Sequence, residues 1–420
     1  MKRLVLVPLA LIMAFSFSPN IGVGAAAPRA PAVRGESVDD EVLVSFKREA
    51  DQPAVARSVG ARVHRRLGNL PVHVLKVPRG TVENVVLTLR RHQDVEFAEP
   101  NGFLHTLVVP NDPFITSCYL ASDGTCTTQW AWERVQAYQA WDITRGSATV
   151  KVAVVDTGID VGDPNGFPPD AGHEDLDCQS IIIKSFISGE SGNDDNGHGT
   201  HVAGTIGACT DNATGVAGAN WAVQLMGVKV LDFSGSGTDA DVAAGIAWAA
   251  DNGAKVINLS LGGGPSSTLQ IAVDYAWNKG AVLACAAGNN GTTVLVYPAA
   301  YPNCIAVAAT DRNDMRAVFS TYGTWVSVAA PGVQILSTLQ DDFFWCFLCY
   351  WFGYSTTYDS LSGTSMATAF VSGLAALIWA RGSCATNACV RNKIESTADP
   401  IPGTGTLWMW GRVNYYNAVR

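Results

Sequence analysis

Four separated motifs of this 420-residue chain carry side chains suited to covalent catalysis on a carbonyl group. In chain order, their polar residues are Asp156, His198, Asn289 and Ser365. A serine hydroxyl is a weak nucleophile that needs a neighbouring base, and histidine serves as that base when a third group orients it. An asparagine amide can donate to the oxyanion that forms during attack. The four residue types together therefore indicate acyl chemistry.

Each motif has a plainer interpretation when it is taken alone. Asp156 ends an apolar run and could be a turn residue, while Ser365 could simply cap the apolar helix that follows it. Asn289 precedes a residue pair, Asn-Gly, that is typical of turns. His198 and His201 could suggest a metal pair, but their spacing and the lack of a nearby carboxylate or cysteine ligand disfavour zinc.

Taken together in this order, the motifs resemble the subtilisin family of serine proteases, whose triad runs Asp, His, Ser. The resemblance covers the chain from residue 110 onward. The sequence is most similar to the thermitase-like branch of the family in segments 111–113, 140–143, 253–257, 275–280 and 411–414. This resemblance implies that Ser365 is the nucleophile, His198 the general base and Asp156 its orienting partner. It also implies that Asn289 and the Ser365 backbone N–H hold the oxyanion, and that His201 is structural.

The resemblance further implies that a substrate binds as an extended strand between two backbone edges. These edges are Ser234, Gly235, Ser236 and Gly237 on one side and Ser260, Leu261, Gly262 and Gly263 on the other. Leu261 and a wall containing Ala287 and Gly288 suggest an apolar primary pocket. We therefore expect broad specificity with a preference for apolar or aromatic side chains at P1.

One structural Ca²⁺ site is also implied by the resemblance. Carboxylate, amide and carbonyl oxygens are the ligands that a hard cation prefers. The implied set combines side chains and backbone carbonyls from two early aspartates and one loop: Asp112, Asp175, Cys209, Asn212, Thr214 and Val216. A second site around Glu190, Asn193, Asp194 and Asp195 stays an open alternative.

The elements that must position these residues follow from apolar runs at 150–155, 181–183, 223–231, 256–261, 281–287, 304–309 and 326–329. The runs are continuous rather than alternating, which is typical of strands covered on both faces. Helical patterns at 238–252, 267–279 and 365–380 lie between or after them. The fold class expected is α/β, a subtilisin-like three-layer sandwich with a mostly parallel seven-stranded sheet.

Three segments are expected along the chain. Residues 1–27 have two basic residues, an apolar stretch and a small-residue run, which is typical of a secretory signal peptide. Residues 28–107 contain strand and helix patterns and resemble an inhibitor-like propeptide of ferredoxin-like α+β fold, and residues 108–420 form the catalytic domain. We expect a secreted zymogen whose propeptide inhibits the catalytic domain and is cut near residues 105–109.

Charge and composition fit this division. Residues 1–107 hold 14 basic and 10 acidic residues, whereas residues 108–420 hold 14 and 27. The acidic excess argues against nucleic acid as a partner. Charged residues make up only 15% and apolar ones 48%, which excludes a disordered chain. No later stretch is long enough for a transmembrane segment, and a monomer is expected.

Ten cysteines, all after residue 107, indicate an oxidising compartment. Ten cysteines allow 945 sets of disulfide pairings, and the sequence does not decide among them. Proximity along the chain favours Cys118–Cys126, Cys178–Cys209, Cys285–Cys304, Cys346–Cys349 and Cys384–Cys389.

Two features depart from the family pattern. Ala369 and Phe370 stand where the family carries Pro and then His, so an acyl-transfer variant is one alternative function. Residues 341–358 form a longer, aromatic segment, for which residues 343–352 could grip an apolar partner or a lipid surface, or could pack on themselves. A non-catalytic binding protein on the same scaffold is the alternative from another class.

Overall fold

The computed structural model describes residues 37–48, 52–102, 108–121, 124–162, 171–340 and 357–420. The expected signal peptide, the core of the aromatic segment and most of the junction before residue 108 lie outside these residues. By its internal contacts the chain divides into two compact units, Met1–Thr106 and Leu107–Arg420. Each unit is described by itself.

The smaller unit is a four-stranded antiparallel sheet with two helices. Its strands lie in the order β2-β3-β1-β4. That order and the βαββαβ succession are ferredoxin-like, as expected. The elements are β1 Ser37–Phe46, α1 Gln52–Ser58, β2 Arg62–Arg66, β3 Val72–Lys76, α2 Val82–Arg90 and β4 Val95–Gly102. The sequence did not predict β2, because all five of its residues are exposed and no apolar alternation marks it.

The larger unit is built on a seven-stranded sheet in the order β13-β12-β11-β10-β7-β9-β8. Every pairing within it is parallel. The seven expected apolar runs are its seven strands, so the predicted fold class is confirmed. The strands are β7 Gly146–Asp156, β8 Ser180–Ser185, β9 Ala222–Lys229, β10 Val256–Leu259, β11 Val282–Ala286, β12 Cys304–Thr310 and β13 Val328–Pro331.

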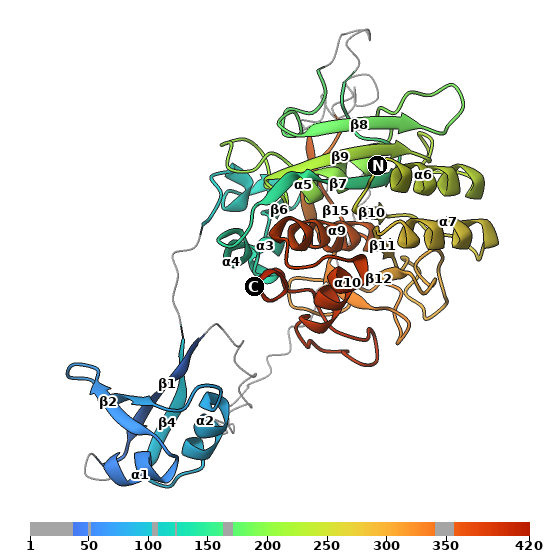
Figure 1. Cartoon of the computed structure of the whole chain (residues 1–420). Coiled ribbons are helices and arrows are strands. Elements are labelled where there is room, and N and C mark those ends of the chain that lie inside the picture. The colour runs from blue at the N-terminus through green and yellow to red at the C-terminus, as the bar shows by residue number, and fades with distance from the viewer. Residues whose placement is uncertain (1–36, 49–51, 103–107, 122–123, 163–170, 341–356) are drawn as a thin grey trace, which may run out of the picture. The chain divides into compact units, whose positions relative to one another are not determined.

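Helices cover both faces of this sheet (Figure 1). Successive residues of β7 alternate between two cores. Val152 and Val154 pack with α5 His198–Gly207 and α9 Thr364–Arg381, whereas Ala153 and Val155 pack with α6 Asp239–Asp251 and α7 Ser267–Asn278. Burial on both faces explains why the strand sequences are continuously apolar.

Smaller elements complete the larger unit. Two short antiparallel pairs lie outside the main sheet: β5 Tyr119–Leu120 with β6 Cys126–Thr127, and β14 Ile335–Thr338 with β15 Tyr358–Leu361. The remaining helices are η2 Pro113–Ile115, α3 Ala131–Arg134, α4 Ala137–Trp141, α10 Asn387–Ser396 and α11 Tyr415–Val419.

The helix ends differ slightly from expectation. Thr238 caps α6, as predicted, by accepting a hydrogen bond from Asp241 N. Ser365 is not an N-cap: α9 begins at Thr364 with Gly363 before it, so the Ser365 side chain is left for another role.

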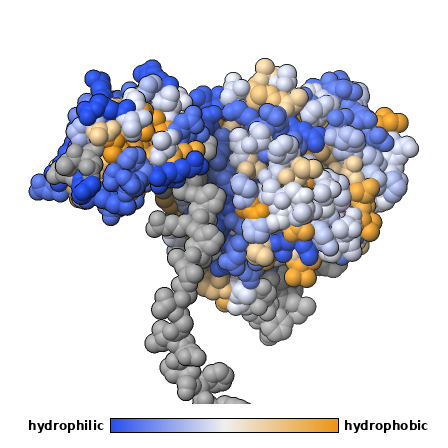
Figure 2. Space-filling model, turned by 90° about the horizontal axis from the view of Figure 1, so that it is seen from below, coloured by the Kyte–Doolittle hydropathy of each residue, from blue (hydrophilic) through white to orange (hydrophobic). Residues whose placement is uncertain are grey.

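On the face of the larger unit shown in Figure 2, apolar residues form small spots between polar ones. Among the described helices, none is long and apolar enough to cross a membrane.

Candidate active site

The four candidate catalytic residues come from one end of the parallel sheet and from the starts of two helices. Asp156 is the last residue of β7, and Asn289 follows β11 by three residues. His198 opens α5 and Ser365 is the second residue of α9. Because strands in a parallel sheet share their carboxyl edge, this topology collects the residues where ligands of such sheets bind.

Asp156 and His198 form a direct pair. The carboxylate is fully buried and its Oδ1 lies 2.7 Å from His198 Nδ1. The same oxygen accepts from Thr157 N at 2.8 Å. Burial lowers the pKa of His198, but the charge and hydrogen bond of Asp156 outweigh burial, and the net pKa is raised above 6.5. The pair therefore suits an imidazole that accepts and holds a proton.

Ser365 is hydrogen-bonded to Ser260, the residue that follows β10. Ser365 Oγ donates to Ser260 O at 3.1 Å, and Ser260 Oγ donates to Ser365 O at 2.9 Å. Among the described residues, Ser365 makes no hydrogen bond with His198. Catalytic hydrogen bonds are often open in a free enzyme and tighten when substrate binds.

Two hydrogen-bond donors face the space beside Gly363. A methyl group placed on the Gly363 Cα would lie 3.5 Å from Asn289 Nδ2 and 3.6 Å from Ser365 N. The Asn289 oxygen accepts from Thr364 N and Thr364 Oγ1, both at 2.9 Å, which turns the amide nitrogen toward this space. The absence of a side chain at Gly363 thus leaves room near these two nitrogen atoms, which is compatible with the expected oxyanion hole.

The start of α5 packs directly on the loop after β7. A Cβ on Gly199 would lie 2.1 Å from Gly158 O, which no side chain tolerates. Glycine beside the first histidine is therefore needed for the helix to bring His198 against Asp156.

A cleft of about 570 Å³ opens beside His198 and Ser260. Its walls include both predicted edges, Ser234, Gly235, Ser236 and Gly237 opposite Ser260, Leu261, Gly262 and Gly263. Ala287 and Gly288, the other predicted substrate contacts, are not among the described residues that line it. The sequence did not single out several lining residues, which come from separate elements: Asn196, Leu231, Val242, Leu269 and Tyr297.

His201 lies behind the site and not in it. Its ring is fully buried and its Nε2 lies 3.0 Å from Ile335 O and 3.2 Å from Asp359 O. Burial lowers the pKa of His201 to about 4, and the neighbouring His198 adds to this. The ring is thus neutral near pH 7 and ties α5 to β14 and β15, a structural role as expected.

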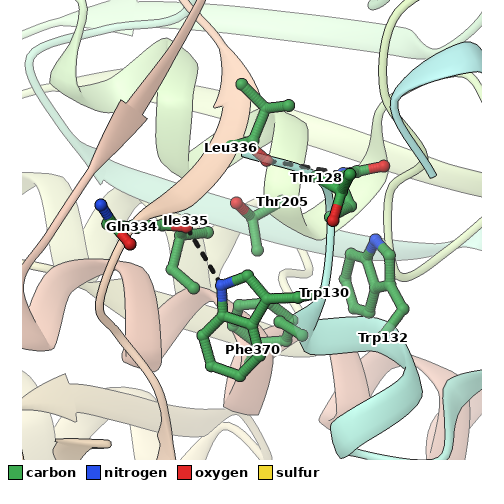
Figure 3. A pocket seen from close by; sticks show the side chains of 10 residues that line it. Thr128, Trp130, Trp132, Thr205, Gln334, Ile335, Leu336 and Phe370 are labelled. Atoms are coloured by element: carbon green, nitrogen blue, oxygen red, sulfur yellow. Dashed lines mark hydrogen bonds between the residues drawn. The ribbon is translucent and has the colours of Figure 1, made fainter. Parts of the chain in front are cut away.

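A much smaller cavity is lined mainly by residues 128–132 and 334–336, with one residue each from α5 and α9. Its volume of about 10 Å³ has room for about one water molecule, and it is lined by Trp130, Thr205 and Phe370 among others (Figure 3). Trp130 Nε1 donates across its edge to Gln334 O at 3.2 Å. The cavity is too small for a substrate group.

The residues implied for calcium lie together. Asp175 Oδ2 accepts from Val216 N at 2.8 Å, its Oδ1 accepts from Asn212 Nδ2 at 2.9 Å, and its carbonyl accepts from Cys209 N at 2.7 Å. Asp112 accepts from Asp211 N at 2.9 Å, while Thr214 N donates to Asn212 Oδ1 at 2.9 Å.

The electrostatics of this loop fit a cation. Asp112 and Asp175 are 2% and 0% exposed, and within the described residues neither forms an ion pair with a basic side chain. Burial raises the pKa of both carboxyls, that of Asp175 to about 7 despite its hydrogen bonds. The described residues hold no group of three or more His, Cys, Asp or Glu suited to a metal, so this set depends on amide and carbonyl oxygens.

The alternative second calcium site already holds a cation of the chain itself. Lys229, fully buried, places its Nζ 2.6 Å from Asp195 Oδ1 and 3.2 Å from Glu190 Oε2. It also donates to Thr157 O and Leu231 O. In the sequence, Lys229 is marked only as the single charged residue of the apolar run 223–231.

Four of the five expected disulfides are formed: Cys118–Cys126, Cys178–Cys209, Cys285–Cys304 and Cys384–Cys389. Cys346 and Cys349 lie outside the described residues, as does the aromatic segment that contains them. Ala369 and Phe370 are fully buried in α9, and the Phe370 ring packs 4.7 Å from that of Trp132.

Comparison with known proteins agrees with this geometry. The profile of the subtilase family, Peptidase S8, matches residues 147–411, and that of the fervidolysin N-terminal prodomain matches residues 25–101. The chain is 42% identical to the thermophilic serine proteinase of Bacillus sp. (strain AK1) over 92% of this chain and 88% of that one. It is 48% identical to thermitase of Thermoactinomyces vulgaris over 74% of this chain and 99% of that one.

A solved structure is similar as well. A protease from Pseudoalteromonas arctica PAMC 21717 matches with a TM-score of 0.61 and 31% identity, over 74% of this chain and 99% of that one. The parallel sheet of the larger unit thus has the subtilisin-like fold. The chain belongs to the subtilase family of serine endopeptidases and carries a fervidolysin-like prodomain ahead of its protease unit.

Proposed function

We propose that this chain hydrolyses peptide bonds through a triad of Asp156, His198 and Ser365. The observation that carries the proposal is the 2.7 Å contact between the buried Asp156 carboxylate and His198 Nδ1. This contact fixes the proton on Nδ1 and leaves Nε2 to accept one.

In the proposed reaction, Ser365 Oγ gives up its contact with Ser260 O and passes its proton to His198 Nε2 as it attacks the substrate carbonyl. Asp156 stabilises the imidazolium that results, and His198 then protonates the leaving amine. Water hydrolyses the acyl-enzyme by the same steps. Asn289 Nδ2 and Ser365 N hold the developing oxyanion in the space beside Gly363.

The substrate class follows from the cleft. The residues Ser234–Gly237 and Ser260–Gly263 line the cleft, which supports backbone pairing with an extended peptide. Such pairing makes little demand on the peptide's sequence. The cleft wall is mixed, and its apolar side chains are Leu231, Val242, Leu261, Leu269 and Tyr297. A preference for apolar or aromatic substrate side chains, P1 included, with broad specificity otherwise, is the proposed selectivity.

A structural Ca²⁺ is proposed for the loop at residues 209–216. Asp112, Asp175 and Asn212 would supply side-chain oxygens, and Cys209, Thr214 and Val216 would supply carbonyl oxygens. When bound, the ion neutralises two buried carboxylates and cross-links segments that are far apart in sequence. It takes no part in the hydrolysis.

We also propose that the protein is a secreted zymogen. Residues 1–27 would direct export, residues 28–107 would inhibit the protease unit until they are cut off, and residues 108–420 would form the mature enzyme. The prodomain match and the disulfides support this order. N-terminal sequencing and intact mass of the secreted product test it.

The proposed activity is tested with a serine-reactive fluorophosphonate and a peptide substrate. Labelling at Ser365, and loss of hydrolysis in Ser365→Ala with an unchanged fold, are expected. An unlabelled chain would favour a non-catalytic binding protein, and near-normal hydrolysis by Ser365→Ala would refute the triad. Adding amine nucleophiles to the same assay separates hydrolysis from acyl transfer.

A further inference from the structure

A second buried carboxylate, Asp194, lies next to the proposed triad but is not part of it. Its residue is 2% exposed. Asp194 Oδ1 accepts from Thr157 Oγ1 at 2.8 Å and from Asn196 N and Gly197 N, both at 3.0 Å. Its Oδ2 accepts from Thr200 N at 2.8 Å and Thr200 Oγ1 at 2.6 Å. Five donors thus converge on one side chain.

These donors belong to the two elements that carry Asp156 and His198. Thr157 directly follows Asp156, and its hydroxyl also accepts from Gly199 N at 2.9 Å. Gly197 and Gly199 flank His198, and Thr200 lies in the same first turn of α5. Asp194 therefore ties the end of β7 to the start of α5 on both sides of the imidazole.

The charge of Asp194 is balanced differently from that of its neighbours. Lys229 forms ion pairs with Asp195 and Glu190 of the same loop. In the described part of the chain, neither lysine nor arginine forms an ion pair with Asp194. Its partners are N–H and O–H donors at the start of a helix, where the helix dipole favours a negative charge.

We propose that Asp194 is a positioning residue for catalysis, which holds the His198–Asp156 pair at the start of α5. The proposal rests on the proposed triad. A small displacement of the imidazole weakens proton transfer from Ser365 much more than it weakens substrate binding, because the cleft walls other than Thr157, Asn196 and His198 come from other segments. The effect of losing Asp194 should therefore fall on kcat.

The test compares full-length wild type, Asp194→Asn and Asp251→Asn on a short neutral peptide. Asn keeps the size of Asp194 but removes the charge and one acceptor oxygen. We expect kcat of Asp194→Asn to fall roughly 10-fold to 100-fold with KM little changed. Asp251→Asn is the control: Asp251 is exposed and pairs with Lys279, so wild-type kinetics are expected.

The pH profile gives a second readout that a merely structural role would not move. The titratable and charged groups that act on His198 are Asp156 at the end of β7 and Asp194 in the loop before α5, and His201 lies in α5 itself. Both carboxylates favour the imidazolium. Removing the Asp194 charge should shift the acid limb of kcat/KM to lower pH.

Thr200→Val is the second variant. It keeps Asp194 and removes one of its donors, Thr200 Oγ1, so we expect kcat to fall roughly 3-fold to 10-fold. If Asp194→Asn does not fold, this variant decides. A wild-type kcat and acid limb in a folded Asp194→Asn, or a wild-type kcat in Thr200→Val, would overturn the proposal. An inactive wild type would instead overturn the proposed function.

Discussion

At the scale of single residues, Asn289 uses the two ends of its amide for different tasks. Its oxygen accepts two hydrogen bonds from Thr364, and its nitrogen faces the space beside Gly363. The first task fixes the orientation that the second needs. Removing the Asn289 amide should therefore lower the stability of the protein little and its activity much.

Asn289→Leu should lower kcat by about 10²–10³-fold, the effect known for removing one oxyanion-hole donor in a subtilisin, with KM nearly unchanged. The physical reason is that the donor acts on charge that develops only in the transition state. Asn290→Leu, one residue further along the same exposed loop, is the matched control. Equal kinetics for the two variants would contradict the assignment.

If the proposed triad acts, His198 should set the lower pH limit of activity. The imidazole must be neutral to accept the Ser365 proton, and the pKa of His198 is raised above 6.5 because Asp156 outweighs the effect of burial. Activity should therefore appear as the pH rises through a value above 6.5, measured as kcat/KM for a neutral peptide. An acid limb centred below 6.5 would show that Asp156 does not dominate.

At the scale of elements, α9 carries the proposed nucleophile at one end and an unbroken run of buried residues, Met366–Ile378, beyond it. Phe370 is 1% exposed and lies against Trp132 of α3. The Phe370 ring thus fills the core between α9 and α3. Ala369, the neighbouring residue, is equally buried.

Phe370→Ala should destabilise the protein by about 3–5 kcal/mol, because it removes a large ring and leaves a cavity that is filled only in part. Thermal unfolding in the Ser365→Ala background, which prevents self-digestion, measures this. Trp410→Ala, at a residue that is 45% exposed, is the control and should change stability by about 0.5 kcal/mol or less. A similar midpoint for both would mean that the core relaxes around the loss.

The strands show how far the sequence alone predicts this fold. All seven strands of the sheet were predicted because burial on both faces makes them continuously apolar. Strand β2 was not predicted, since its residues are exposed. The role of Lys229 was not predicted either, because the sequence does not show which groups its ammonium contacts. The cleft residues Tyr297 and Asn196 come from loops whose approach is set by tertiary packing. Sequence motifs predict the triad, but the residues that surround it come from distant parts of the chain and are not marked by such motifs.

At the scale of the whole molecule, the loop at residues 209–216 joins the first residues of the larger unit to its body. Asp112 lies near the start of that unit and Asp175 follows β7. Both are buried, and hydrogen bonds from the loop reach both of them. Calcium bound there would stabilise the folded state by mass action.

Removing calcium with a chelator should lower the unfolding midpoint of the Ser365→Ala protein by about 4 °C, for an ion present at 100 times its Kd. Differential scanning calorimetry with and without chelator measures the change. Asp175→Asn should already have the lower midpoint and should respond little to chelator. An unchanged midpoint in the parent protein would argue against the site.

The buried Lys229 has a different consequence for the same molecule. A cation that is covalently part of the chain cannot be diluted away or extracted, since its effective concentration beside Asp195 and Glu190 is fixed by the fold. The loop that leads to His198 therefore keeps its charge balance when free calcium is scarce, whereas the loop around Asp175 would lose the balance that the proposed calcium supplies. Scarce calcium would thus limit the lifetime of the enzyme before it altered the chemistry of the enzyme.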